Sequence, residues 1–362
     1  METPFYHSNH SKRRTAMKSK NVWFKVMAFF VVGILFSLWP NVTVGWAKPI
    51  ELKVATATSE TAAYYVGVKQ ALDSIAARSN GRVKFAYFPR KTLVKARSTY
   101  DAVVKGVCDI SIVQPAYFPG RFPLTDVVSI EPAFVSNTEA GKNWLFIKEN
   151  LLHEWSEVKV LCLNAKGSDV MMMAKKPVRT PDDLRGKRMF AIGITAKYMA
   201  AFKATPIRMS PLELYESLQK RIVDGACIGG MAAKTIKLAE VCKYMTVPGF
   251  GNIFSFTIMR KKSYELLPPD IKRLFDDLEN TVPPAIGKLS DEQMEKAYRY
   301  FKDQGGEIIY LTPQERAAFL KIAMEVNEEW AKGLEAKGLP GRMILEKRYR
   351  FMKKYMPDVF PK

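Results

Sequence analysis

The segment from Thr180 to Met231 constrains the fold more than any other part of the chain, because it alternates strand and helix signals. Short apolar runs at 188–192, 207–209 and 226–229 predict strands. Ser210-Pro211-Leu212-Glu213 is a capping box with proline at the first helical position, which predicts a helix between the last two strands. This order implies a parallel sheet covered by helices, in which ligands bind beyond the carboxyl ends of the strands.

A second α/β unit precedes this segment. Apolar and β-branched runs predict strands at 52–57, 83–88, 110–113 and 158–163. Helical periodicity predicts helices at 61–79, 98–105 and 138–155. The two units therefore flank a crossover near 164–168, and the loops at 56–59 and 114–117 are expected to form a pocket.

The C-terminal third predicts an apolar strand at 254–259 that crosses back to the first unit. Helix starts are predicted at Pro269, at the capping box Ser290–Gln293 and at a further capping box that begins with Thr312. The last of these helices is expected to run to about Lys337. The tail from Gly341 is expected to add one basic helix, packed onto the body by apolar and aromatic side chains.

Residues 1–47 have the order of a signal peptide. Six basic residues precede a fourteen-residue apolar run from Val26 to Trp39, which is short for a membrane span of about 20 residues. The small residues of Gly45-Trp46-Ala47 predict cleavage before Lys48 and export to a bacterial periplasm. The export route, through a general or a twin-arginine signal, and the start at Met1 or Met17 are both left open.

The formal net charge of +20 is high, and +15 remains once residues 1–47 are set aside. Such a balance favours anionic partners. The basic residues are scattered over many predicted helices and accompany no zinc-finger or RNP-type motif, so nucleic acid is not an expected partner.

The usual catalytic signatures are absent from the sequence. It contains no GxSxG, HExxH or Walker-type motif, and only His153 lies outside residues 1–47, so neither a catalytic centre nor a metal or cofactor is expected. Four cysteines allow three disulfide pairings, and buried free thiols are equally compatible with the apolar runs around them: Cys108, Cys162, Cys227 and Cys242.

Three segments, PVRTPDDLRGKRM, ATPIRMSPLELYESLQ and IVDG, resemble the second lobe of DctP-like solute-binding proteins of TRAP (tripartite ATP-independent periplasmic) transporters. The resemblance extends through ELKVATATSE, SNGRVKFAYFP, AVVKGVCDISIVQPAYF and EPAF, so it covers nearly all of residues 50–335. It implies an α/β, two-lobe periplasmic-binding-protein (venus-flytrap) fold with hinge strands and a long C-terminal helix that spans both lobes. The crossing runs place lobe 1 at 50–167 and 254–292, and lobe 2 at 168–253 and 293–362.

The resemblance also implies the function. Such a protein captures a small organic ligand in the cleft between its lobes, without catalysis or a cofactor. It then delivers the ligand to a permease of small and large membrane subunits. An exported enzyme or a ligand sensor on the same scaffold is the alternative.

The expected pocket departs from the family at its central cation. Organic-acid binders of the family carry GLK[IL]R, whose arginine pairs with the ligand carboxylate, whereas Phe190 stands at that position here. Arg188 points to the same side of the strand but roughly 6.6 Å away. Val170 stands where the family often has another arginine.

We therefore expect a neutral, aromatic or largely apolar ligand. Phe190, Ile228 and Met231 would hold it, and the polar groups would come from Gln114, Tyr117, Asn252 and either Tyr64 or Tyr65. In the alternative, Phe190 belongs to the core of lobe 2 and an anion is held by Arg208 or Lys197.

Overall fold

The computed structural model describes residues 48–359, so the predicted signal peptide lies outside the described residues. Within this range, no helix combines the length and the apolar character that a membrane crossing requires. The unit from Pro49 onward contains two β-sheets with helices packed around them.

The first sheet has five strands in the order β2-β1-β3-β10-β4. β1 pairs in parallel with β2 and β3, and β10 is antiparallel to β3 and β4. Its strands are β1 (Ile50–Ala55), β2 (Val83–Phe88), β3 (Ile110–Val113), β4 (Val158–Ser168) and β10 (Asn252–Arg260).

The second sheet has six strands in the order β11-β9-β5-β8-β6-β7. β6 is parallel to β7 and β8, whereas β5 is antiparallel to β8 and β9. Its strands are β5 (Val170–Met173), β6 (Arg188–Phe190), β7 (Thr205–Ile207), β8 (Gly225–Ile228), β9 (Tyr244–Val247) and β11 (Glu307–Tyr310). The expected parallel order is thus confirmed for β6, β7 and β8, and the sheet as a whole is mixed.

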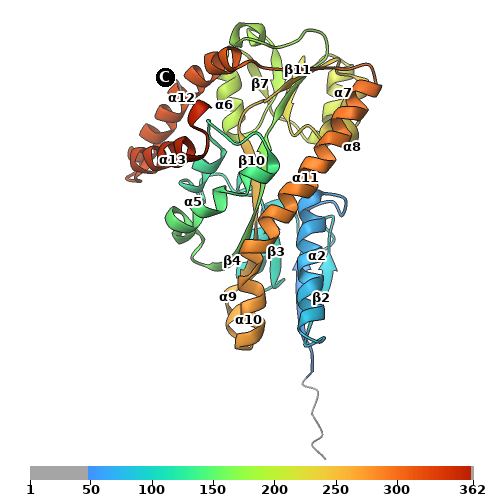
Figure 1. Cartoon of the computed structure of the whole chain (residues 1–362), viewed down its shortest axis with the longest axis vertical. Coiled ribbons are helices and arrows are strands. Elements are labelled where there is room, and N and C mark those ends of the chain that lie inside the picture. The colour runs from blue at the N-terminus through green and yellow to red at the C-terminus, as the bar shows by residue number, and fades with distance from the viewer. Residues whose placement is uncertain (1–47, 360–362) are drawn as a thin grey trace, which may run out of the picture. The chain divides into compact units, whose positions relative to one another are not determined.

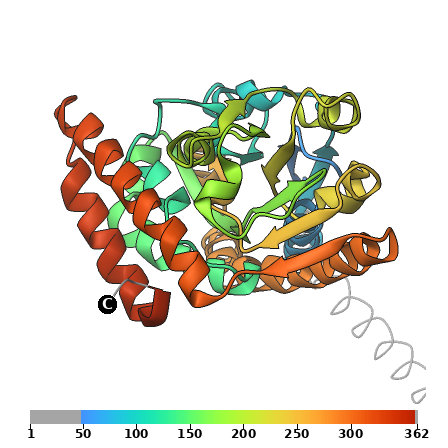
Figure 2. The same cartoon turned by 90° about the horizontal axis from the view of Figure 1, so that it is seen from above.

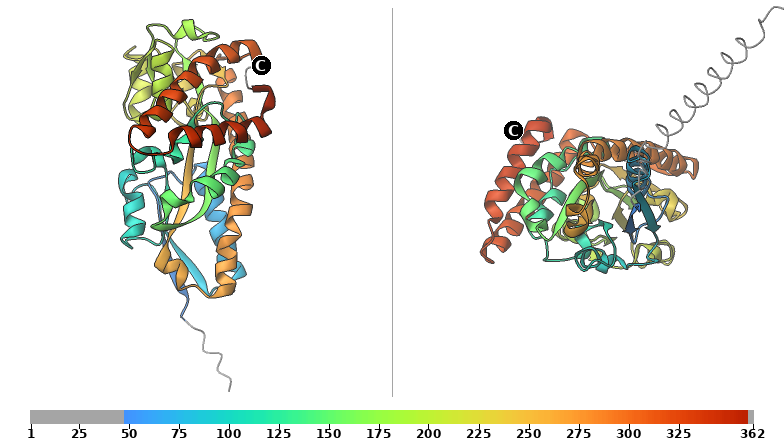
Figure 3. Two further views of the ribbon diagram at one scale, coloured as in Figure 1. Left: turned by 90° about the vertical axis from the view of Figure 1, so that its left-hand side faces the viewer. Right: turned by 90° about the horizontal axis from the view of Figure 1, so that it is seen from below.

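Two chain crossings join the sheets and lie against each other. β4 passes through Asp169 directly into β5, and the chain returns from β9 through 248–251 into β10, which pairs with β4 from Asn252↔Ser168 to Arg260↔Val158. The left panel of Figure 3 shows these two long strands side by side. A Cβ at Gly249 would lie 2.2 Å from the carbonyl oxygen of Asp169, so the crossings approach as closely as glycine allows.

Two long helices each contact elements beside both sheets. α11 (Leu278–Asp303) packs on α2 (Ala63–Arg78) beside the first sheet and on α8 (Ala232–Thr235) beside the second, as its orange ribbon shows in Figure 1. α12 (Pro313–Glu335) begins with the predicted capping box of Thr312 and Glu315. The first half of α12 packs against residues of the second sheet. The last helical turns of α12 pack against residues of the first sheet.

The remaining helices are shorter and surround the sheets. Figure 2 shows α13 (Gly341–Tyr355) lying beside α12, where its buried Ile344 and Met352 join the core of the first sheet. The others are α3 (Thr99–Val104), α4 (Asn137–Ala140), α5 (Asn143–Asn150), α6 (Gly193–Ala201), α7 (Leu214–Gln219), α9 (Lys261–Glu265) and α10 (Pro269–Asp276). Short 3-10 turns lie at Ala96–Ser98, Pro115–Tyr117, Thr125–Ser129, Leu152–Trp155, Pro181–Leu184, Pro211–Glu213, Leu238–Glu240 and Pro357–Val359.

Two sequence predictions about helices were wrong. The single helix expected over 138–155 is split into α4, α5 and a 3-10 turn, with Gly141 and Lys142 between α4 and α5. Ser290 does not start a helix, because it is buried in the interior of α11, which continues through Pro283 and Pro284. Close packing of α11 on α2, α4 and β4 accompanies this run through two prolines.

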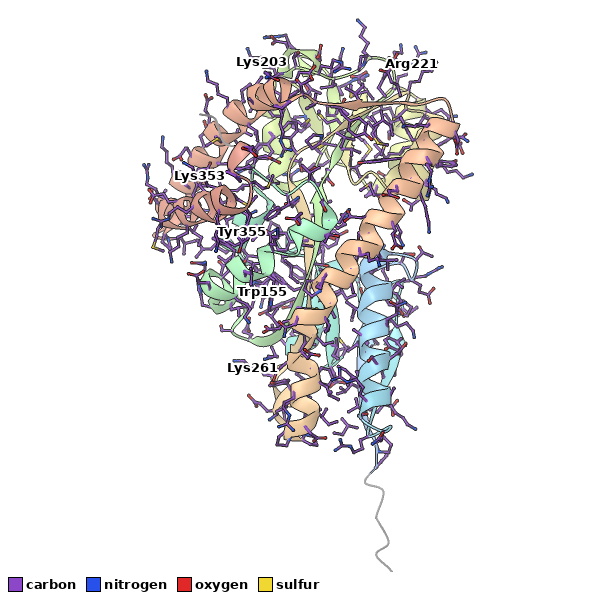
Figure 4. The ribbon with its side chains drawn as sticks, in the orientation of Figure 1. Trp155, Lys203, Arg221, Lys261, Lys353 and Tyr355 are labelled. Carbon is purple, nitrogen blue, oxygen red and sulfur yellow. The ribbon has the colours of Figure 1, made fainter. Side chains whose placement is uncertain are left out.

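Side chains at the surface and in the core are clearly separated. Trp155 is buried under the first sheet, where its ring stacks on Phe122 at 3.8 Å and its Nε1–H donates to Thr125 Oγ1. Figure 4 shows Lys203, Arg221, Lys261 and Lys353 at four separate places on the periphery.

All four cysteines are buried and free, so the alternative of a disulfide is wrong.

Candidate functional site

A cavity of about 220 Å³ lies where several strands of both sheets end. Gln114 follows β3 of the first sheet, Ile192 follows β6 and Arg208 follows β7 of the second, and all three line the cavity. The crossing segment Gly251 to Phe254 forms a further part of the wall. The cavity therefore occupies the edge of the sheets at which the strand order predicts a ligand.

The wall of the cavity is mainly apolar with a few charges. Its large apolar side chains come from loops, from the start of β10 and from the helices α6 and α12: Ile130, Ile192, Ile194, Ile253, Phe254 and Trp330. The basic side chains are Lys197 on α6 and Arg208, and the acidic ones are Asp126 and Asp169. The exposed side chain of Arg208 makes no hydrogen bond or ion pair with another described residue, so its guanidinium group is available to an anion.

The first turn of α6 also faces the cavity, because Gly193, Ile194 and Thr195 line it together with Lys197. Gly193 has a positive φ of 57°, which glycine adopts readily as the chain turns from β6 into the helix. A helix N-terminus carries partial positive charge, so this wall adds to the field of Lys197 and Arg208.

A side pocket of about 70 Å³ shares Gln114, Ile253 and Phe254 with the cavity. Lys166 on β4 and Tyr64 on α2 line this side pocket, and Asp169 lines the main cavity nearby. Burial raises the pKa of Asp169 to about 7, opposed by the charge of Lys166, and burial lowers the pKa of the Lys166 ammonium, opposed by the charge of Asp169.

A buried carboxylate holds the cavity wall in place. Glu131 accepts hydrogen bonds from the backbone N–H groups of Gly251 (2.8 Å) and Ala133 (3.1 Å), and Arg316 lies 3.8 Å away. The backbone N–H of Glu131 in turn donates to the hydroxyl group of Tyr198, which donates to Asn327 of α12. Segments from three parts of the chain are thus fixed around the entrance to β10.

Several of the sequence-predicted residues meet at this site. Gln114 and Asn252 line the main cavity, and Tyr64 with Gln114 lines the side pocket. The Nδ2 group of Asn252 donates to the carbonyl oxygens of Phe134 and Gly251, whereas its buried Oδ1 has no partner among the described residues. Tyr117 is 42% exposed and lines neither cavity, so its contact with a ligand stays a prediction.

The structure places the other predicted residues away from the cavity. Phe190 and Val170 are 2% and 1% exposed and belong to one core cluster of the second sheet, and Tyr65 is buried in a cluster of the first. Ile228 and Met231 are half-buried and do not line either cavity. Contact of these five residues with a ligand stays a prediction, and the arrangement favours the alternative in which Phe190 is core.

The side chain of Arg188 is also bound by other residues of the protein. Its guanidinium pairs with Asp224 at 3.1 Å and donates to the carbonyl oxygen of Arg221 at 2.6 Å. It therefore does not replace the arginine that the family carries at position 190.

Sequence reasoning missed Lys166, Asp169, Asp126 and Trp330 as lining residues. A signal existed for the first two: Lys166-Gly-Ser-Asp169 interrupts two apolar runs with charged residues. Trp330 lies on α12, far along the chain from the other lining residues. No local sequence pattern around it indicates that it reaches the cavity. In residues 48–359 no group of three or more His, Cys, Asp or Glu side chains is arranged to hold a metal ion.

Comparison with known proteins agrees with this geometry. The model of the family "bacterial extracellular solute-binding protein, family 7" (DctP) matches residues 54–333. The 2,3-diketo-L-gulonate-binding periplasmic protein YiaO of Escherichia coli is 25% identical over 74% of this chain and 83% of its own length.

Solved structures of similar fold are TRAP periplasmic solute-binding proteins. One from Desulfovibrio salexigens is 28% identical and superposes with a TM-score of 0.79, over 87% of this chain and 98% of its own. A marine metagenome protein specific for aromatic acid ligands, in complex with 3-hydroxybenzoate, is 23% identical with a TM-score of 0.77, over 86% of this chain and 100% of its own. With its family match over most of its length and its two-sheet architecture, the chain belongs to the family 7 extracellular solute-binding proteins, which capture small organic ligands for TRAP transporters.

Proposed function

We propose that this protein binds a monocarboxylate with an aromatic or other apolar body in the main cavity. Arg208 takes the carboxylate, Lys197 and the first turn of α6 add to the positive field, and the isoleucine, phenylalanine and tryptophan side chains contact the body of the ligand. The observation that carries the proposal is an unpaired guanidinium facing a mainly apolar wall.

This proposal revises the ligand expected from the sequence in one respect. A neutral ligand would leave Arg208 without a counter-charge, whereas a carboxylate can accept a bidentate pair from it. A second carboxylate on the ligand would lie near Asp126 or Asp169 and be repelled. The aromatic body expected from the sequence is retained, and it is supported by the aromatic acid bound to the metagenome relative.

The cellular role follows from the family. We propose that residues 1–47 direct export and are removed before Lys48. The mature protein then works in the periplasm, as relatives named periplasmic binding proteins do, and delivers its ligand to the small and large membrane subunits of a TRAP permease. N-terminal sequencing of the protein from the periplasmic fraction tests this, and a chain there that still begins at Met1 or Met17 contradicts it.

We also propose that the two lobes, 50–167 with 254–292 and 168–253 with 293–362, close over the ligand by bending at the paired crossings. Small-angle X-ray scattering with and without ligand tests the closure, which should lower the radius of gyration. An unchanged scattering curve at a saturating ligand concentration contradicts it.

The ligand class is tested by isothermal titration calorimetry on the purified protein. Benzoate is the carboxylate probe, benzamide is its neutral counterpart and succinate is the small dicarboxylate. We expect binding of benzoate, at least tenfold weaker binding of benzamide and no strong binding of succinate.

The role of Arg208 is tested by Arg208→Gln, with Arg299→Gln on the exposed part of α11 as the matched control. Loss of one charge-assisted pair costs about 1.5–3 kcal/mol, so the affinity for benzoate should fall roughly 10- to 100-fold in Arg208→Gln and stay unchanged in Arg299→Gln. Equal affinity of Arg208→Gln and wild type for benzoate, or a wild-type preference for benzamide, would refute the assignment.

A further inference from the structure

Two charged side chains face each other across Gly229 without forming an ion pair. A methyl group at Gly229 would lie 3.4 Å from Lys166 Nζ and 3.8 Å from Asp169 Oδ1, so both groups border the same small space. The ammonium and the carboxylate are too far apart to pair directly, and neither side chain makes a hydrogen bond with another described residue.

The backbone holds these two groups in position. Asp169 is 4% exposed, its N–H donates to the carbonyl oxygen of Gly251, and its carbonyl oxygen accepts from Gly249 N–H at 2.6 Å. Lys166 lies within β4. Asp169 lies between β4 and β5, and Gly229 directly follows β8, whose last residue Ile228 pairs with Val170, so both positions adjoin paired strands.

The chemistry of the pair selects its ligand group. A second anionic group at Lys166 would be repelled by the Asp169 carboxylate, and a second cationic group at Asp169 would be repelled by the ammonium. A hydroxyl group satisfies both, because its oxygen accepts from the ammonium while its hydrogen is donated to the carboxylate. The neighbouring side pocket offers further neutral polar groups from Gln114 and Tyr64.

We propose that Lys166 and Asp169, across Gly229, form a hydroxyl-binding subsite, so that the preferred ligand is a hydroxylated aromatic or apolar monocarboxylate. This inference rests on the proposed function, since it takes the carboxylate of the same ligand to be held at Arg208. Lys166 and Asp169 then determine the preference for a hydroxylated ligand, whereas Arg208 contributes the main affinity for the carboxylate.

The test compares benzoate with 2-, 3- and 4-hydroxybenzoate by calorimetry on wild type, Lys166→Met and Asp169→Asn. In the wild type, at least one hydroxybenzoate should bind about tenfold or more tightly than benzoate, as expected for hydrogen bonds to charged groups. Both variants should lose this difference between the hydroxybenzoates and benzoate. Lys296→Met on exposed α11 is the control and should behave as wild type.

A third variant tests the subsite even if the two charge variants fail to fold. The backbone at Gly229 does not have a positive φ, and a Cβ there makes only ordinary contacts, so Gly229→Ser should fold. Its hydroxyl group should occupy the subsite and abolish the preference for hydroxybenzoates.

The outcomes separate the two proposals. Failure of the wild type to bind any of the four acids overturns the proposed function and this inference with it. Binding of benzoate with no tighter hydroxybenzoate, or a hydroxyl preference that survives in Lys166→Met and Asp169→Asn, overturns only the subsite.

Discussion

Replacing Phe190 by alanine distinguishes a core residue from a ligand contact. The Phe190 side chain is 2% exposed and packs in a cluster with Val170, Met172, Leu214 and Ala226 of the second sheet. It lines neither the main cavity nor the side pocket. We therefore expect Phe190→Ala to lower the free energy of unfolding and to leave the affinity of the folded protein for its ligand unchanged.

The size of the effect follows from the burial. A phenylalanine buries about 150–250 Å², worth roughly 4–6 kcal/mol at about 25 cal/mol per Å², and alanine retains a small part of that area. Substitutions of this kind cost about 3–5 kcal/mol. For a chain of this length that unfolds in one transition, the entropy of unfolding converts this to a fall in Tm of roughly 5–8 °C.

The assay is differential scanning calorimetry of the variant, followed by ligand titration well below its Tm. Leu266→Ala is the control, because Leu266 is 73% exposed and its loss should change Tm by less than about 1 °C. A variant with wild-type Tm and a tenfold loss of affinity would refute the reasoning. It would indicate instead that Phe190 contacts the ligand.

Two further predictions concern single positions. Gly167→Ala should lower Tm markedly, since its Cβ would lie 1.9 Å from the carbonyl oxygen of Val135, whereas Gly333→Ala, with no atom within 4 Å in α12, should raise the stability by roughly 0.5–1 kcal/mol; equal Tm values for the two variants would contradict this. Asp169 has a pKa raised from 3.8 to about 7, so the folded state binds the proton more tightly than the unfolded state and stability falls as the pH rises between those values. The Tm of Asp169→Asn minus that of wild type should therefore be more positive at pH 8 than at pH 5 in thermal scans, and a difference that does not change with pH would rule out this titration.

The sequence predicts the two-sheet architecture well, because strand and helix signals alternate and most strands were expected within a few residues of their true bounds. It fails where tertiary packing overrides local signals. The capping box at Ser290 predicts a helix start, yet α11 runs through this residue and through Pro283 and Pro284 while packed on α2, α4 and β4. Local periodicity likewise cannot show that 138–155 bends at Gly141.

The site is predicted less completely, for a geometric reason. Alternation along β6 shows that Arg188 and Phe190 share a side, but it does not show which side of the sheet is covered by helices. Gln114 and Asn252 were found because they stand where strands end or begin. Arg208, which was named only as an alternative, stands at the end of the neighbouring strand β7, whose pairing with β6 becomes visible only in the folded sheet.

The four buried cysteines lie in four different parts of the apolar core. Cys108, Cys162, Cys227 and Cys242 lie one in each of the four apolar clusters, and burial raises the thiol pKa to about 12 for Cys108, Cys162 and Cys242 and well above its ordinary value for Cys227. A folded chain thus presents almost no thiolate to an oxidant, whereas an unfolded chain exposes all four thiols. During refolding, the rate at which each thiol becomes protected from alkylation therefore reports how fast the apolar cluster around it packs. Comparing the four rates gives the order in which the parts of the protein fold.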